Sequence, residues 1–355
     1  MMKDTLAEAI NRVANATITL LRDKFENREP AIQRWDWPPG VGLYGLIRAY
    51  ETLGRQDYLD YCQHYVDRLL DADHVSYSIN GSVVFATVLK LVEHTGEERY
   101  RTELRYFLRW LLGSAPRCQN DSFEHSWTNT KAHLTEQVWI DTLFMAGIAL
   151  ADSYRVLGRE DCRAEAVRQF VAHQTCLQDA DTGLYYHLYN GVTDSHMAGA
   201  FWARGNGWMA ASLLDVVDAI GRDNPEHRAI VSSFQRQMNA LRALQTADGA
   251  FHTILDDPST YVEMSATAAL GYAALKAVRV GLLDETFRSL GEKATQAVLA
   301  HITPDGIVGQ VSSGTSGFIA YEDYNQIPIA PQLWGQGLAM LLMIEQLRLA
   351  QERRG

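Results

Sequence analysis

The chain has 355 residues, of which 47% are hydrophobic, enough apolar material for one large core or two ordinary domains. The formal net charge of −11 argues against a nucleic-acid partner, because such surfaces need clustered Lys and Arg. No apolar run approaches the roughly 20 residues that span a bilayer, so we expect no membrane partner. Asp4 and Glu8 stand where a signal peptide would be basic and then apolar, which favours a cytoplasmic location.

The cysteine pattern bears on metal binding and on the redox compartment. Cys62, Cys118, Cys162 and Cys176 show no CxxC spacing and no companion histidine pattern. They are typical of reduced thiols. We therefore expect no metal site, and nothing in the sequence indicates a cofactor.

Helix pairs repeat along the chain. In each copy an apolar helix rich in small residues leads, through a break often built on Gly, into a more charged amphipathic helix. Five copies occupy residues 43–70, 83–112, 142–177, 208–245 and 265–302. The first helix (3–25) and the last (337–350) have no partner, and pairing them closes a ring. The pattern predicts an all-α fold, an (α/α)6 toroid of six inner and six outer helices, as a single catalytic domain over 1–355.

An open helical solenoid is the alternative, although its repeats are usually shorter and more uniform. Strand signals are sparse. Residues 184–189 and 251–255 are expected to form short β-hairpin edges in loops.

In such a ring, the loops that enter the inner helices open on the same side. The chemically conspicuous residues lie at these entries: Trp35, Trp37, Ser78, Asn80, Asp141, Arg204, Asn206, Trp208, Glu263, Ser265 and Trp334. Six helix N-termini would also direct their positive dipole ends and unpaired amides into one cavity. An anionic ligand could therefore be bound locally by this acidic protein.

The stretch FWARGNGWMA (201–210) has the composition of a sugar-acid site. The indoles of Trp202 and Trp208 could lie flat on a pyranose ring, and Arg204 could form a forked pair with a carboxylate. The alternative is that both tryptophans are core residues and Arg204 is an ion-pair partner at a helix start.

Asp141, in QVWIDTLFMAGI, is the candidate general acid. At helical spacing it shares a face with Phe144, Met145 and Ile148, so we expect its carboxyl group to face an apolar wall. Desolvation would raise its pKa and keep part of it protonated near neutrality. The alternative is a helix-capping or internally paired carboxylate.

Four other polar residues are weaker candidates. Gln137 and His133 precede Asp141 by one and two helical turns and could hydrogen-bond to it or to the ligand. His187, in TGLYYHLY, follows a predicted turn, and a loop histidine without a role is the alternative. Glu263, with Ser265 as a possible N-cap, is either a second site carboxylate or an exposed glutamate in a first helical turn.

Six motifs together resemble a known family: QVWIDTLFMAG, TGLYYHLY, FWARGNGWMA, YVEMSATAALGYA, AHITPDGIVGQVSSGTSG and QLWGQGLAMLLMIEQ. In this order and spacing they resemble the unsaturated rhamnogalacturonyl hydrolases of glycoside hydrolase family 105, siblings of the unsaturated glucuronyl hydrolases of family 88. The resemblance runs from about residue 35 to the C-terminus.

The resemblance implies removal of a 4,5-unsaturated uronic acid from the non-reducing end of oligosaccharides made by polysaccharide lyases. Asp141 would protonate carbon 4 and assist the addition of water to carbon 5, and the resulting hemiketal would open and release the aglycone. Paired catalytic carboxylates are then not required. The remaining contacts would come from Arg204 on the carboxylate, from Trp37, Trp202 and Trp208 as walls, and from His133 and His187 near the hydroxyls or the reacting region.

One position departs from the family pattern. The family often has a second aspartate at the entry of the second inner helix, where this chain has Asn80; Ser78 and Asp73 are poorer equivalents. Asn80 can bind hydroxyl groups but cannot share a proton with Asp141.

Two other classes of function remain open on the same toroid. An inverting glycosidase would need a second carboxyl group roughly 6.5–9.5 Å from the first, and a sugar epimerase would need paired histidines. A non-catalytic carbohydrate-binding protein would keep the tryptophans without needing Asp141. The aglycone and the oligomeric state cannot be inferred from the sequence.

Overall fold

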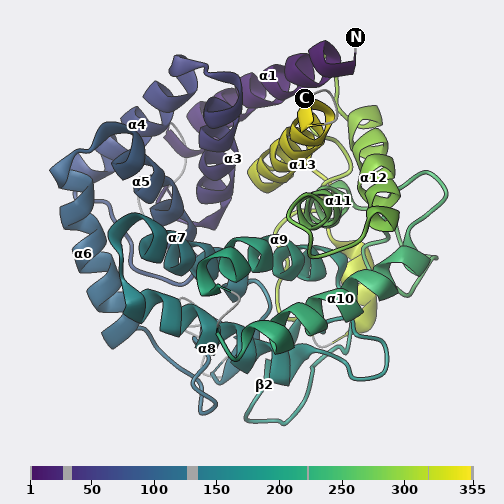
Figure 1. Ribbon diagram of the computed structural model, residues 1–355. Coiled ribbons are helices and arrows are strands. Elements are labelled where there is room, and N and C mark those ends of the chain that lie inside the picture. Colours follow the sequence, from purple (N-terminus) through teal and green to yellow (C-terminus); the bar gives the residue numbers. More distant parts are fainter. Residues whose placement is uncertain (1, 27–33, 126–134, 222–223, 319, 353–355) are drawn as a thin grey trace.

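The computed structural model describes residues 2–26, 34–125, 135–221, 224–318 and 320–352. Over these residues the helices form two concentric rings around a common axis (Figure 1). The predicted all-α toroid of six inner and six outer helices is confirmed.

The inner ring consists of apolar helices that alternate along the chain with the outer ones. Its members are α3 (Trp37–Leu53), α5 (Ser82–Thr95), α7 (Ile148–Leu157) with the π-helical segment η4 (Leu143–Gly147) before it, α9 (Ala203–Ile220), α11 (Met264–Arg279) and α13 (Leu333–Glu352).

The outer ring consists of α1 (Met2–Leu20) and its π-helical extension η1 (Leu21–Glu26), α4 (Gln56–Asp71), α6 (Glu98–Gly113), α8 (Glu160–Leu177), α10 (His227–Leu244) and α12 (Arg288–Ala300). The shorter elements are η5 (Glu285–Phe287), η6 (Tyr321–Gln326), β1 (Gln137–Trp139) and β2 (Leu188–Asn190).

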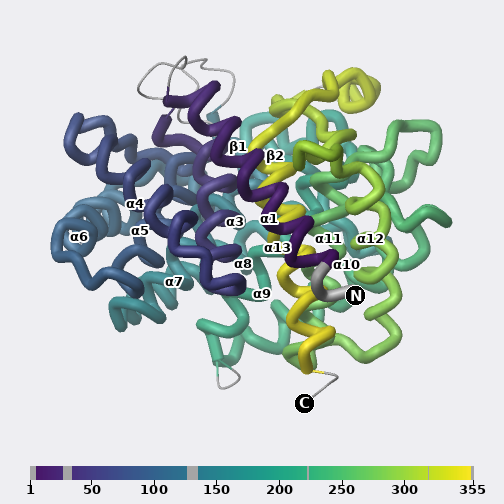
Figure 2. The backbone as a smooth tube through the Cα atoms, turned by 90° about the horizontal axis from the view of Figure 1, so that it is seen from above, coloured from purple at the N-terminus to yellow at the C-terminus, as the bar shows by residue number. Residues whose placement is uncertain are grey.

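The first and last helices close the ring. The outer helix α1 packs against α13 and α3, and both views show it beside these two helices (Figures 1 and 2). Because an open solenoid would leave its terminal helices apart, that alternative is wrong.

The burial of each helix follows its place in the ring. In the inner helix α5 every residue from Ser82 to Val92 is buried. The outer ring covers one side of this helix, and the side chains that fill the ring axis cover the other. The outer helix α4 buries one stripe, including Tyr58, Cys62 and Leu69, and exposes the opposite face. This is the expected difference between a helix that is apolar all round and an amphipathic one.

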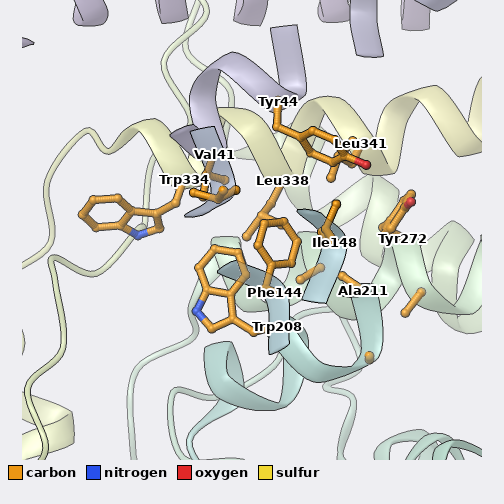
Figure 3. Packing of buried hydrophobic residues seen from close by; sticks show 14 of the residues in the cluster. Val41, Tyr44, Phe144, Ile148, Trp208, Ala211, Tyr272, Trp334, Leu338 and Leu341 are labelled. Carbon is orange, nitrogen blue, oxygen red and sulfur yellow. The ribbon is translucent and has the colours of Figure 1, made fainter. Parts of the chain in front are cut away.

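Side chains of the inner helices fill the axis of the ring. Figure 3 shows Tyr44, Phe144, Trp208 and Leu338, from four different inner elements, directed toward one another. The ring centroids of Phe144 and Trp208 are 4.5 Å apart. The toroid therefore has a packed core along its axis and no open channel at this level.

Buried ion pairs occupy the C-terminal halves of the inner helices. Lys276 donates to Asp215 across α11 and α9 at 2.6 Å, and Arg279 donates to Glu345 across α11 and α13 at 2.7 Å. The cations lie where the negative dipole end of their own helix stabilises them. The end of the ring that bears the C-terminus is therefore held by ion pairs.

Strand structure lies at the opposite end from the C-terminus (Figure 2). The predicted edge at 184–189 is confirmed in part, because β2 begins at Leu188 and pairs in antiparallel fashion with β1. Residues 251–255 form isolated bridges, His252 with Val262 and Ile254 with Trp202, and no regular strand. Over the described residues no helix is both long and apolar enough to cross a membrane.

Two glycines allow α3 and α13 to approach closely. A Cβ atom placed at Gly45 would lie 2.6 Å from Gly337 Cα, and one placed at Gly337 would collide with the Val41 carbonyl oxygen. Backbone atoms cannot yield as a flexible side chain does, so a methyl group at Gly337 must push the two helices apart.

We therefore expect Gly337→Ala to lower the free energy of unfolding by about 1–3 kcal/mol, the usual range for overpacking. The measurement is the thermal unfolding temperature. Gly113→Ala at the end of α6 is the matched control, since a Cβ there would meet no heavy atom within 4 Å. Equal unfolding temperatures for Gly337→Ala and wild type would contradict the account.

Candidate active site

The pairing of β1 with β2 places Asp141 beside His187. Trp139 is the register partner of Leu188, and one residue further the amide of Ile140 donates to the His187 carbonyl at 3.0 Å. Asp141 follows β1 and His187 precedes β2, so the short ladder brings together two residues that are 46 positions apart in the chain.

Asp141 also begins an inner helix. Its carbonyl accepts from the amides of Phe144 and Met145 at 3.0 and 3.1 Å, and the helix then continues as η4 before α7. Segments of π-helix inside helices occur frequently at functional sites. The Asp141 side chain is 14% exposed, so the carboxyl group is largely buried but remains accessible.

A chain of polar groups runs from Asp141 to Tyr324. His187 Nε2 lies 3.3 Å from Asp141 Oδ2, within ion-pair distance but without aligned hydrogen-bond geometry. His187 Nδ1 is 2.6 Å from the Tyr324 hydroxyl group. Burial and then the charge of Asp141 raise the pKa of Tyr324 well above its usual range. The hydroxyl group therefore keeps its proton, and by donating it to Nδ1 it places the imidazole N–H on Nε2, facing Asp141.

The pKa of Asp141 differs in direction from the sequence-based expectation. Burial does raise it, but the side chain of His187 beside the carboxyl group and the charge of the Arg204 guanidinium outweigh burial, and the pKa lies below its usual value. The expected raised pKa is therefore wrong. Sequence periodicity predicted the apolar neighbours of this carboxyl group, but it could not predict the neighbours that lower its pKa.

His125 is a site residue that sequence reasoning missed. Its Nδ1 lies 2.9 Å from the Thr142 hydroxyl group, and its ring stacks on Trp139 with centroids 4.8 Å apart. Burial lowers the pKa of His125 to about 4, so the imidazole is neutral at neutral pH. It can serve as a neutral hydrogen-bonding group near Asp141.

Arg204, in the first turn of α9, is 1% exposed, and its guanidinium binds a segment far along the chain. Nη1 donates to the carbonyl and hydroxyl groups of Ser312 at 3.0 and 2.6 Å. Nη2 donates to the Ser313 carbonyl and the Thr315 hydroxyl group, each at 2.8 Å. Nε is buried without a partner among the described residues. The fork expected for a ligand carboxylate is thus occupied by residues 312–315, and Nε is the donor still available.

Glu263 is neither a second site carboxylate nor an exposed glutamate, the two alternatives that the sequence suggested. It is fully buried and is itself the N-cap of α11, accepting from the Ala266 amide at 2.6 Å and from the Ser265 hydroxyl group at 2.8 Å. It also accepts from the Ser312 amide at 2.9 Å and lies 3.5 Å from Arg204. With both oxygens engaged, it is a structural anchor for Arg204.

A row of side chains connects the candidate acid to the rim of the mouth. The ring of Trp202 lies 4.3 Å from that of His187, and Arg204 Cζ lies 4.7 Å above the Trp202 ring. On its other side Arg204 Cζ is 5.5 Å from the Trp334 ring, and Trp334 lies 4.3 Å from Trp37. Trp202, Arg204 and Trp37 are thus brought together with Asp141, as the predicted convergence of inner-helix entries requires.

The remaining predicted site residues lie in different surroundings. Trp208 is buried and packs on Phe144 in the axis core, and Asn80 lies half-buried in the turn before α5. Gln137 accepts from the Trp139 indole at 2.7 Å, so its oxygen holds Trp139 in place and does not bond to Asp141. His133 lies outside the described residues.

Three missed residues share a reason. His125, Tyr324 and Ser312 lie in the connections between the ring helices, Tyr324 in the short 3-10 helix η6, where the helical period of the repeat carries no information. A weak signal existed for Trp139, which precedes Asp141 by two residues in a predicted extended stretch. Over the described residues no group of three or more His, Cys, Asp or Glu side chains could hold a metal ion.

A helical toroid with a carboxylate, an imidazole, a buried guanidinium and several indoles at one end defines a carbohydrate-active enzyme. The family model for Glycosyl Hydrolase Family 88 matches residues 9–350. The chain belongs to this family and is a glycosidase.

Relatives agree with this assignment. The chain is 35% identical over 315 residues to the unsaturated rhamnogalacturonyl hydrolase YesR of Bacillus subtilis (strain 168). The alignment covers 88% of this chain and 90% of that protein. The crystal structure of a possible member of the GH105 family from Salmonella enterica matches with a TM-score of 0.90 at 29% identity, covering 99% and 95% of the two chains. The resemblance to families 105 and 88 is thus confirmed.

A more distant solved structure shares the fold. The unsaturated glucuronyl hydrolase of Bacillus sp. GL1 matches with a TM-score of 0.75 at 17% identity, over 98% of this chain and 97% of that one.

The row of polar groups from Asp141 through His187 to Tyr324 gives a first test of the site. Tyr324→Phe removes the donor that fixes the His187 tautomer, so we expect kcat to fall about tenfold, the value of one hydrogen bond, with a smaller change in KM. Tyr189→Phe is the matched control, because that hydroxyl group bonds to Asp194 on the surface at 2.6 Å. An unchanged kcat in the Tyr324 variant would show that the hydroxyl group has no positioning role.

Proposed function

We propose that this protein removes a 4,5-unsaturated uronic acid from the non-reducing end of lyase-generated oligosaccharides, by hydrating the C4=C5 vinyl ether. Family membership and the activity of the 35% identical relative from Bacillus subtilis support this reaction. The observation that carries it is the partly accessible carboxyl group of Asp141, which faces His187 near a buried arginine.

The reaction needs one proton donor that becomes a base. Asp141 gives its proton to carbon 4, and a water oxygen bonds to carbon 5 while its proton returns to Asp141. The hemiketal at carbon 5 then opens to a ketone, and carbon 1 releases the aglycone. Because acid and base are the same group, one carboxyl group suffices.

His187 and Arg204 have distinct roles in this proposal. His187 holds Asp141 in place through Nε2 and is itself held by Tyr324. Arg204 supplies positive charge for the uronate and keeps residues 312–315 in position, with Nε left to donate to the ligand. The partly exposed Trp37 offers an aromatic face to the sugar, whereas Trp202 and Trp208 are buried and support the site from behind.

An inverting glycosidase is a poorer explanation of the same site. That mechanism needs a second carboxylate free to activate water, and Glu263 was the sequence-based candidate. Its oxygens already accept from Ser265, Ala266 and Ser312. A carboxylate so occupied cannot deprotonate water without dismantling the Arg204 support.

The finer assignments are also proposals. We propose that the whole chain acts as one catalytic domain in the cytoplasm and that rhamnose, from pectin-derived rhamnogalacturonan, is the aglycone. The identity of the 35% identical relative supports the rhamnose assignment. No feature of the described residues indicates an oligomeric state.

The reaction can be followed by the ultraviolet band of the double bond, which disappears on hydration. We expect wild type to remove this band from lyase-digested rhamnogalacturonan, and Asp141→Asn to be slower by at least a thousandfold, because the amide cannot give a proton. The variant should keep the wild-type unfolding temperature. A normal rate in Asp141→Asn would remove the proposed acid.

The pKa direction of Asp141 gives a second test. In the free enzyme the pKa lies below its ordinary value, so the group is ionised at neutral pH and kcat/KM should fall steadily as pH rises above the acidic range. A bound uronate is a like charge that raises the pKa of Asp141, so the fall in kcat should occur at higher pH. Identical apparent pKa values in the two profiles would contradict this coupling.

A further inference from the structure

Of the residues around a cavity at the rim of the mouth, the reaction described so far uses only Trp37. The cavity has a volume of about 510 Å³ and is lined by Phe25, Lys24, Asp36, Trp37, Gln332 and Trp334, among others. Its walls come from the end of the outer element η1 and from the starts of the inner helices α3 and α13. Pockets for small ligands commonly have volumes of 300–1,000 Å³.

The cavity adjoins the candidate active site across two indoles. Trp334 contacts Arg204 through its ring at 5.5 Å and Trp37 at 4.3 Å, so the two indoles separate the arginine from this space. A ligand held near Asp141 and Arg204 reaches the cavity by extending past one aromatic pair. An oligosaccharide is a ligand that extends in this way.

The lining has the chemistry of a sugar site. The partly exposed Trp37 offers an aromatic face, and three polar side chains surround it. Asp36 caps α3 by accepting from the Trp37 amide through Oδ1 at 2.8 Å, and among the described residues its Oδ2 has no hydrogen-bond partner that would compete with a ligand. Burial raises the pKa of Asp36 to about 6, consistent with a recess shielded from bulk water.

Lys24 and Gln332 complete the polar set. Lys24 Nζ donates to the Pro331 carbonyl at 3.1 Å, and an ammonium group has two further protons to donate. Gln332 Nε2 donates to the Ser313 hydroxyl group at 3.0 Å, so this side chain links the cavity to the segment that holds Arg204. Donors and an acceptor around an aromatic face suit a polyhydroxylated ring better than a charged or purely apolar ligand.

We propose that this cavity is an aglycone subsite, in which a sugar of the leaving oligosaccharide stacks on Trp37 and hydrogen-bonds to Lys24 and Asp36. The proposal rests on the proposed hydrolase function. It assigns part of the selectivity for longer substrates to residues 24 and 36, which lie outside the reacting centre.

The test compares two substrates that share the unsaturated uronate. One is its methyl glycoside, which is too short to enter the cavity; the other is a tetrasaccharide from lyase-digested rhamnogalacturonan. We expect wild type to have the higher kcat/KM on the tetrasaccharide. Lys24→Met and Asp36→Asn should each lower the ratio of the two kcat/KM values about tenfold, as expected for one lost hydrogen bond to a charged group.

Control variants separate the subsite from a general effect. Asp36→Asn keeps an oxygen to cap α3, so its unfolding temperature should match wild type. Arg228→Met removes a cation from the exposed surface of α10 and should leave the ratio unchanged. An unchanged ratio in both cavity variants would overturn the subsite while leaving the hydrolase function intact.

A binding measurement covers the case in which the reaction itself is misassigned. The saturated trisaccharide that remains after removal of the uronate should bind wild type in calorimetry, and Lys24→Met should bind it about tenfold more weakly. Wild-type inactivity on both unsaturated substrates would refute the hydrolase function. Absence of trisaccharide binding, or equal binding by the variant, would refute the subsite.

Discussion

The mouth of the toroid depends on one buried ion pair, between Arg204 and Glu263. Neither side chain is more than 1% exposed, and burying two charges is unfavourable unless hydrogen bonds satisfy both. Glu263 accepts from the amides of Ala266 and Ser312, and Arg204 donates to residues 312–315. These bonds join α9, α11 and a segment about 110 residues after Arg204. The pair therefore fixes where the surrounding indoles can lie.

The two ends of the ring differ in how their charges are balanced. Lys276 and Asp215 neutralise each other near the C-terminal ends of inner helices, where the helix dipoles favour cations. At the other end the dipoles favour anions, and the carboxylate of Glu263 there is matched by Arg204. An acidic chain with a net charge of −11 can thus attract a sugar acid at one place, because local dipoles and one guanidinium act over shorter distances than the net charge does.

The fold and the site differed in how far they could be predicted from sequence. Helical periodicity is local, so the six pairs and the convergence of Asp141, Arg204 and Trp37 at the inner-helix entries followed from the repeat alone. Tyr324 and His125 lie in connections between the ring helices, and their approach to Asp141 depends on tertiary packing. The expected direction of the Asp141 pKa shift was wrong for the same reason. The direction depends on the contact with His187 that the pairing of β1 with β2 creates, and a three-residue ladder leaves almost no signal in sequence.

The lowered pKa of Asp141 is compatible with its proposed role as an acid. Arg204 is already paired with Glu263, so a uronate carboxylate that binds nearby adds an anion close to Asp141 without a new cation to balance it. Two anions close together are less stable than one, so the group with the more accessible oxygen takes up a proton. A neutral sugar would leave Asp141 ionised and unable to protonate carbon 4. On this account the charge of the uronate is needed for the chemistry as well as for binding, which is why a single carboxyl group can both select the substrate and act on it.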